Sequence, residues 1–226
     1  MIKQLTSKKN LNEAYLQVYR NKGAGGVDDI QVTELKSILQ VSGQRQNEQI
    51  ERGTYQVSPI KGVEIPKSNG KARLLGIPTV VDRFYQQALH QVLQPIFEPN
   101  FRKHSYGFRP GRNAHQALQQ SLENINSGYQ DILDIDLKSF FDEVEHYILL
   151  ELIYKKVKCK ATMKLLRLFL RTPILINGKL QKRRKGVPQG SPLSPLLSSP
   201  VAPGAPFAPL VSRVPFCPFC PLTVEP

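Results

Sequence analysis

The residues best suited to chemistry are four aspartates in and beside one short apolar segment. The segment spans residues 131–142, DILDIDLKSFFD, and it contains Asp131, Asp134, Asp136 and Asp142. Because side chains alternate along a strand, Asp134 and Asp136 share one face if the segment is extended. Carboxylates held on rigid backbone are the ligands that hard cations such as Mg²⁺ prefer, and two such cations can promote phosphoryl transfer. Aspartates also flank strands for structural reasons, so this segment alone leaves both interpretations open.

A second candidate site is the loop at residues 186–195, whose sequence is GVPQGSPLSP. Pro188 restricts the loop backbone, and Gly190 removes a side chain where another group has to come close. Gln189 can both donate and accept hydrogen bonds. These residue types suit a surface on which a ligand packs closely.

The charge of the chain indicates a polyanionic partner. The net charge is +13, and no acidic residue occurs between Glu151 and Glu225. Twelve basic residues lie within 155–185: Lys155, Lys156, Lys158, Lys160, Lys164, Arg167, Arg171, Lys179, Lys182, Arg183, Arg184 and Lys185. A phosphate backbone neutralises such a run by releasing counterions, so nucleic acid is favoured over a membrane surface. The alternative is a solvated helix face followed by a basic loop.

Two loops add features that suit a nucleic-acid backbone. The glycine-rich turn NKGAGGVDD, residues 21–29, includes Lys22 and lacks the Lys-Ser/Thr ending of a P-loop. The loop HSYGFRPGRNAH, residues 104–115, mixes aromatic side chains with Arg109 and Arg112. A glycine-rich turn beside a helix can grip an RNA backbone, while aromatic rings stack on bases and arginines contact phosphates. Both loops are therefore predicted to contact RNA.

Helical and extended periodicities alternate along the chain, which predicts a mixed α/β fold. Helices are predicted at 8–20, from Asp82 through Ile96, after a capping Asn113, and at 160–171. In the helix after Asn113, Ala117, Leu118 and Leu122 are expected to lie inside. Strands are predicted at 54–78 around a turn at Ser68–Gly70, at 131–137, and in a hairpin at 174–182 around Asn177-Gly178.

The composition divides the chain into three parts. We expect an N-terminal extension at 1–53, a main domain at 54–198 and a proline-rich tail at 199–226. Prolines recur every third residue from Pro200 to Pro209, and Glu225 is the tail's one acidic residue. Such a segment cannot bury a core, so we predict a disordered tail that arises from a truncated or frameshifted gene. A linker to a further domain is the alternative.

Five motifs in order resemble those of group II intron-encoded reverse transcriptase/maturases over residues 10–198. They are NKGAGGVDD, RLLGIPTVVDRFYQQAL, HSYGFRPGRNAHQAL, DILDIDLKSFF and GVPQGSPLSP. The resemblance implies a right-hand polymerase with fingers and an incomplete palm. Two positions depart from the family pattern: Asp29 replaces a glycine, and Tyr147 replaces an acidic residue.

The resemblance also assigns roles to particular residues. It implies that Asp136 and the carbonyl of Leu137 bind Mg²⁺, that Phe141 excludes a 2′-hydroxyl, and that Asp134 lies outside the metal site. Residues expected to contact the incoming dNTP or the template are Lys67, Arg73, Phe141, Gln189, Gly190 and Ser191. Residues expected to contact RNA are Lys22, Arg109, Arg112, Lys182, Arg183, Arg184 and Lys185.

The implied function is RNA-directed DNA synthesis associated with intron mobility and splicing. The implied partners are group II intron RNA, a DNA primer and dNTPs. The family's Tyr-Ala-Asp-Asp motif is missing from the sequence, so we predict that this chain does not polymerise DNA. The alternatives are a non-catalytic RNA-binding maturase fragment and a pseudogene product.

The remaining candidates carry less information. His90, His104, His115 and His146 lack ligand spacing, and the pair Cys217 and Cys220 has no second pair for a zinc site. The N-terminus has no signal peptide pattern, and no window is apolar enough to span a membrane. We therefore expect a cytoplasmic protein.

Overall fold

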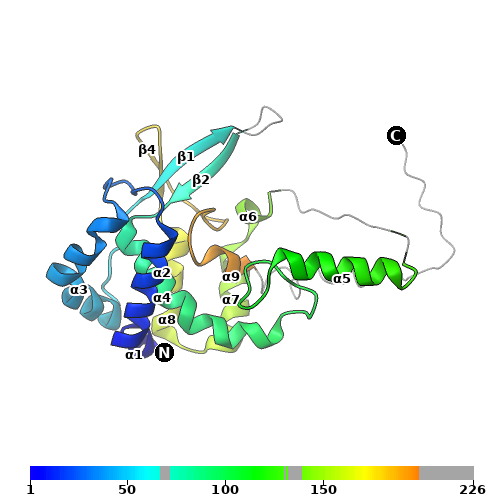
Figure 1. The fold of residues 1–226 in the computed structure, drawn as a ribbon. Helices are drawn as coiled ribbons and strands as arrows, with labels where there is room; N and C mark the ends of the chain where they lie inside the picture. The colour runs from blue at the N-terminus through cyan, green and yellow to red at the C-terminus, as the bar shows by residue number, and fades with distance from the viewer. Residues whose placement is uncertain (67–71, 130, 132–138, 199–226) are drawn as a thin grey trace.

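The computed structural model describes residues 1–66, 72–129, 131 and 139–198. Figure 1 shows a body of packed helices, a hairpin that rises from its upper end, and the helix α5 projecting away from it. The mixed α/β class predicted from the sequence is confirmed. Several predictions lie outside the described residues: the strand at 131–137, the roles of Lys67, Asp134, Asp136 and Leu137, and the tail at 199–226.

The N-terminal region is helical. It contains α1 (Ile2–Leu5), α2 (Lys8–Asn21), the 3-10 helix η1 (Val32–Glu34) and α3 (Leu35–Arg52). The predicted helix at 8–20 is confirmed as α2, and its N-terminus is capped by the Ser7 side chain, which accepts from the Asn10 backbone N–H. No element was predicted where α3 lies.

The central helix of the core is α4 (Val80–Phe97), which buries ten of its residues. Its N-terminus is capped by Thr79, whose side-chain oxygen accepts from the Asp82 backbone N–H. The neighbouring α2 packs on α4, and the Asn10 amide donates to the Ala88 carbonyl at 3.0 Å. The N-terminal helices therefore share one apolar core with α4.

A buried carboxylate joins the start of α4 to the chain that enters the sheet. Asp82 accepts hydrogen bonds from the Tyr55 hydroxyl at 2.8 Å, the Thr79 hydroxyl at 2.8 Å and the Ser58 N–H at 3.1 Å. Burial raises the pKa of Asp82 to about 6, although these hydrogen bonds oppose the shift. The network fixes the path that leads into the first strand.

The sheet has the strand order β2-β1-β3-β4. Its strands are β1 (Ile60–Pro66), β2 (Ala72–Ile77), β3 (Ile174–Ile176) and β4 (Lys179–Gln181). The β1–β2 and β3–β4 pairs are antiparallel, whereas β1 and β3 are parallel, with Ile60 opposite Ile174. The hairpin predicted at Asn177-Gly178 is confirmed, and both turn residues have positive φ angles, 48° and 75°.

The helix α5 (Ala114–Asn126) follows η2 (Glu98–Asn100) and a loop. Asn113 caps it as predicted, because its side chain accepts from the Gln116 N–H at 3.0 Å. The prediction that Leu118 and Leu122 lie inside is wrong, since they are 67% and 52% exposed. Their apolar spacing is real, but α5 extends beyond the helices that would cover them (Figure 1).

The remaining helices are α6 (Phe140–Glu143), α7 (His146–Val157), α8 (Lys160–Arg171) and α9 (Ser194–Ser198). The helix predicted at 160–171 is confirmed as α8. Across the described ranges, none of the helices has the length and apolarity needed to cross a membrane.

Candidate functional site

A cavity of about 540 Å³ brings together six residues that the sequence predicted to contact ligands. They are Lys22, Arg73, Phe141, Gln189, Gly190 and Ser191. These residues come from the end of α2, from β2, from α6 and from the loop that precedes α9. Segments separated by more than a hundred residues therefore form one concave surface.

Arg73 and Gln189 contact each other across this cavity. The Arg73 Nε donates to the Gln189 Oε1 at 2.5 Å, and the backbone of Gln189 accepts from the Gly76 N–H at 2.8 Å. The second bond attaches the 186–195 loop to β2. The Arg73 and Gln189 side chains are thus both positioned next to β2.

Gly190 fits where a larger residue could not. Its φ angle is +120°, and a Cβ built on it would lie 2.5 Å from the carbonyl oxygen of Gly76. The close approach expected from the sequence is therefore made to the β2 backbone, where a side chain would not fit.

The same loop holds Phe141 in place. The Val187 N–H donates to the Phe141 carbonyl at 2.7 Å, and the Gly186 N–H donates to the Val144 carbonyl at 2.7 Å. The His146 ring Nε2 is 2.7 Å from the Gly186 carbonyl oxygen. The backbone of Phe141 is consequently held by the same loop that carries Gln189.

The Ser191 hydroxyl points into the protein and is buried. It donates to the Gln86 side-chain oxygen at 2.9 Å and accepts from the Leu193 N–H at 3.2 Å. Ser194 adds a bond from its hydroxyl to the Pro188 carbonyl at 2.6 Å. In this structure Ser191 shapes the loop through its side chain.

Among the cavity residues that sequence reasoning missed are Arg83, Gln87 and His90, which all belong to α4. The Arg83 Nη2 donates to the Ala24 carbonyl at 2.8 Å, and its Nη1 lies beside Gly23, whose φ is +93°. Burial lowers the pKa of Arg83 and that of His90. Arg83, Gln87 and His90 follow the i, i+4, i+7 spacing and so form a polar stripe on an apolar helix. This stripe is the sequence pattern that could have indicated a site on α4.

The cavity is electropositive. Lys22, Arg73 and Arg83 line it, and none of the described lining residues is acidic. The Nε of Arg83 is buried and has no hydrogen-bond partner within the described part of the chain. Fork-shaped guanidinium donors of this kind suit phosphate groups.

Comparison with known proteins identifies the family. A family model described as reverse transcriptase (RNA-dependent DNA polymerase) matches residues 65–203. The chain belongs to the reverse transcriptase family. The resemblance to group II intron-encoded proteins is also confirmed by the relatives below.

Two relatives illustrate the similarity. The chain is 36% identical over 205 residues to protein YkfC of Escherichia coli strain K12, which covers 88% of this chain and 54% of that protein. It is 36% identical over 194 residues to group II intron-encoded protein LtrA of Lactococcus lactis subsp. cremoris, which covers 82% of this chain and 31% of that protein. This reverse transcriptase chain spans about half or less of the length of these relatives.

Solved structures support the fold. A chain of a partial Cas6-RT-Cas1–Cas2 complex superposes with a TM-score of 0.59 at 23% identity, covering 88% of this chain and 33% of that one. At this identity the likeness concerns the arrangement of helices and strands.

Reverse transcriptases as a family use divalent metal ions. The cavity lining does not fit a metal by itself, because its charged side chains are cations. Within the described ranges, no group of three or more histidine, cysteine, aspartate or glutamate side chains is placed to hold one. Asp136 and Leu137, to which the metal role was assigned, lie outside the described residues.

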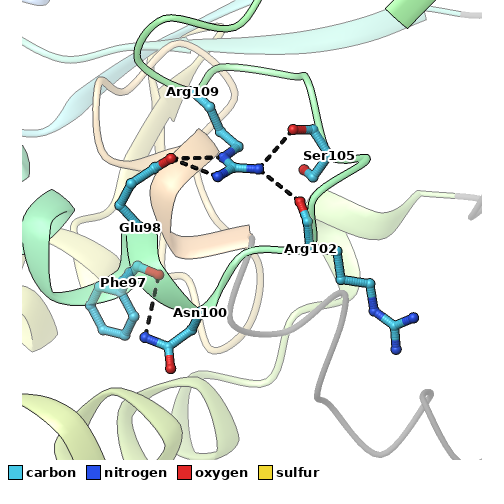
Figure 2. Close-up of polar contacts among 6 residues, drawn as sticks. All are labelled: Phe97, Glu98, Asn100, Arg102, Ser105 and Arg109. Carbon is cyan, nitrogen blue, oxygen red and sulfur yellow. Dashed lines mark hydrogen bonds and ion pairs between the residues drawn. The ribbon is translucent and has the colours of Figure 1, made fainter. Parts of the chain in front are cut away.

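The reverse transcriptase motif at 104–115 is held together by Arg109. Figure 2 shows its guanidinium between Glu98 and the carbonyls of Arg102 and Ser105. Its Nη2 is 2.7 Å from the Glu98 Oε1, and its Nη1 donates to both carbonyls at 2.8 Å. The Arg109 side chain is 8% exposed and also lies over the Phe101 ring. Arg109 therefore orders this loop, and its contact with RNA stays a prediction.

The other predicted RNA contacts differ in exposure. Lys182 and Arg184 are exposed, and Arg112 lies over the Tyr106 ring. Lys185 pairs with Glu143 at 2.5 Å. Arg183 is partly buried, and burial lowers its pKa while nearby Asp142 opposes the shift. Lys182 and Arg184 are therefore the members of this group most available to a partner.

The departure at Asp29 has a structural explanation. Asp29 has a φ of +52°, a backbone region that favours glycine. Its carboxylate lies 2.6 Å from the Lys61 Nζ at the start of β1. An exposed ion pair thus joins the glycine-rich turn to the sheet, at a conformational cost that glycine would avoid.

Proposed function

We propose that this chain is the fingers and partial palm of a group II intron reverse transcriptase, and that its cavity binds a dNTP opposite an RNA template. The observation that carries the proposal is the gathering of Lys22, Arg73, Phe141 and Gln189 around one cavity. The family membership supports the same activity.

The chemistry of the lining supports a division of roles. Arg73 offers charge-assisted hydrogen bonds to a triphosphate, and Lys67 is proposed to join it. Lys22 is proposed to contact the RNA template. Phe141 offers an apolar ring to a sugar, and Gly190, which has no side chain, leaves room beside Gln189 for a base. Asp136 and the Leu137 carbonyl are proposed to bind Mg²⁺, which would supply charge stabilisation for phosphoryl transfer when bound.

The test of the cavity is dNTP binding by the full chain with an RNA–DNA hybrid present. Arg73→Ala should weaken binding by roughly 10- to 100-fold, the value of one charged hydrogen bond. Arg45→Ala, an exposed arginine on α3, is the matched control and should leave binding unchanged. Equal affinities for the two variants would overturn the proposal.

A separate test concerns catalysis. We propose that the 226-residue chain does not extend a primer, because Asp136 lacks the Tyr-Ala-Asp-Asp carboxylates that would share the metals. Primer extension with Mg²⁺ and dNTPs should give no product above that of Asp136→Ala. Extension that disappears in Asp136→Ala would contradict this.

The second candidate function is an RNA-binding maturase fragment without catalysis. The excess of basic residues in 155–185 favours it. RNA binding without dNTP binding would support this candidate over the first.

The partners proposed are group II intron RNA and a DNA primer, and the proposed location is cytoplasmic. The proposed organisation is an extension at 1–53, the main domain at 54–198 and the tail at 199–226. A cooperative thermal transition would argue against a pseudogene product.

A further inference from the structure

A second cationic hollow lies between α7 and α8 and shares no lining residue with the cavity described above. It has a volume of about 620 Å³. Four exposed cations line it from α8, namely Lys160, Lys164, Arg167 and Arg171. Their i, i+4, i+7, i+11 spacing places them along one face of the helix.

Most of these cations have no acidic partner among the described residues. Within the described part of the chain, no ion pair involves Lys160, Arg167 or Arg171. Lys164 lies beside Gly53 at the C-terminus of α3, where a cation also complements the helix dipole. From Lys160 to Arg171 the row is about 16 Å long at 1.5 Å per residue, enough to follow several phosphates of one strand.

The opposite wall of the hollow carries aromatic side chains. Tyr147 and Tyr154 of α7 line it and are 69% and 46% exposed. They are seven residues apart and therefore lie on the same face of α7. Large exposed rings beside a row of cations suit nucleotides with unpaired bases, because the rings can stack on them.

We infer that the α7–α8 groove binds a single-stranded segment of RNA, with α8 cations on its phosphates and α7 tyrosines on its bases. This inference rests on the proposed function, because it takes RNA as the partner. It adds a surface for RNA outside the cavity that contains Arg73 and Gln189.

One carboxylate in the groove offers a further test of whether a phosphate strand binds there. Glu151 lines the hollow and pairs with Lys155 at 3.3 Å, with both side chains about two-thirds exposed. A phosphate strand in the groove is repelled by this charge. Glu151→Gln should therefore tighten RNA binding by about twofold or more at low salt.

The test is a salt titration of binding between the full chain and a short unstructured RNA. The double variant Lys160→Glu/Arg167→Glu should lower the slope of log K against log salt by about 1.4, which is 0.7 for each lost phosphate contact on a single strand. The matched control is Arg45→Glu/Arg52→Glu, which has the same spacing and charge change on α3 and should leave the slope near wild type.

Tyrosine variants test the stacking. Tyr147→Ala and Tyr154→Ala should each weaken single-strand binding at least about fivefold, and phenylalanine at either position should restore it. An RNA duplex of the same length should bind more weakly and should not respond to the tyrosine variants. A duplex that binds equally well would overturn the single-strand assignment.

The outcomes separate the two proposals. An unchanged salt slope in the α8 double variant overturns this inference, and the cavity proposal stands if Arg73→Ala still weakens dNTP binding. If Arg73→Ala leaves dNTP binding unchanged while the α8 double variant still lowers the salt slope, only the cavity proposal is overturned. If the chain binds no RNA, the proposal that the α7–α8 groove binds single-stranded RNA is overturned.

Discussion

The helices α4 and α5 share an amphipathic sequence pattern, but α4 lies inside the protein core and α5 lies outside it. Both are amphipathic, and both begin at a side chain that caps the first turn, Thr79 for α4 and Asn113 for α5. Yet α4 buries ten residues, whereas α5 buries none. Leu118, Leu122 and Ile125 of α5 are each more than half exposed.

The contrast shows that an apolar stripe in the sequence predicts which face of a helix is apolar. It does not predict whether another element of the protein packs against that face. The stripe of α4 is covered by α2 and by the surrounding core. The stripe of α5 has no such cover among the described residues. The core around α4, which also includes residues of α7, α8 and α9, should therefore behave as the stable unit, and the region around α5 as a surface with unused apolar area.

The largest effect should come from the core of α4. Leu89→Ala removes a fully buried side chain and should cost about 2–5 kcal/mol in unfolding free energy. Urea denaturation measures it. A cost below about 1 kcal/mol would mean that α4 is not the centre of the stable unit.

The Asp82 network should make the α4 region sensitive to pH. Burial raises the pKa of Asp82 to about 6 from an ordinary 3.8, so the folded chain keeps a proton that the unfolded chain has lost. Stability should therefore fall as the pH rises from about 4 to about 6, by roughly 2–3 kcal/mol, and then level off.

The matched variant is Asp82→Asn, which cannot titrate. His90 and His146 have lowered pKa values because of burial, and they act in the opposite sense near pH 6. The difference between wild type and Asp82→Asn isolates the aspartate. Parallel stability curves from pH 4 to pH 6 would contradict the assignment.

A smaller effect should arise in the loop between the two helices. Arg109→Ala removes the ion pair with Glu98 and two bonds to backbone carbonyls, which should cost about 1–3 kcal/mol. We expect faster proteolysis within 101–112 while α4 stays protected. Arg102→Ala is the control, since only its backbone carbonyl takes part in the network (Figure 2).

The smallest effect should come from α5 itself. Leu118→Ala and Leu122→Ala should each change the unfolding free energy by about 0.5 kcal/mol or less, because these side chains are exposed. A cost like that of Leu89→Ala would show that α5 is packed in solution. Light scattering should also show less self-association in Leu118→Glu than in wild type.

Much of the fold could be predicted because the signals were local. The cap at Asn113, the turn at Asn177-Gly178 and the apolar stripe of α8 each lie within a few residues. The helix α3 was missed because Gly43 lies in its middle and the residues after Gly43 are mostly polar, so its stability depends on the core against which it packs.

The site was predicted in part for the same reason. Arg73, Phe141 and Gln189 belong to recognisable motifs, and their meeting in one cavity follows from the fold. Arg83 and His90 were overlooked because a polar residue on an apolar helix has many possible partners. The pairing of Arg109 with Glu98 joins residues eleven apart in a loop, which residue type alone does not reveal.

The parallel pairing of β1 with β3 has a consequence for synthesis of the chain. Ile60 and Ile174 are neighbours in the sheet but 114 residues apart in sequence. At about 5–20 residues per second, a ribosome needs roughly 6–23 seconds to add the partner of β1 after β1 itself. During that interval the β1–β2 hairpin has an open edge that can pair with another nascent chain. Translation speed between these two strands should therefore influence how much of the protein reaches the native sheet.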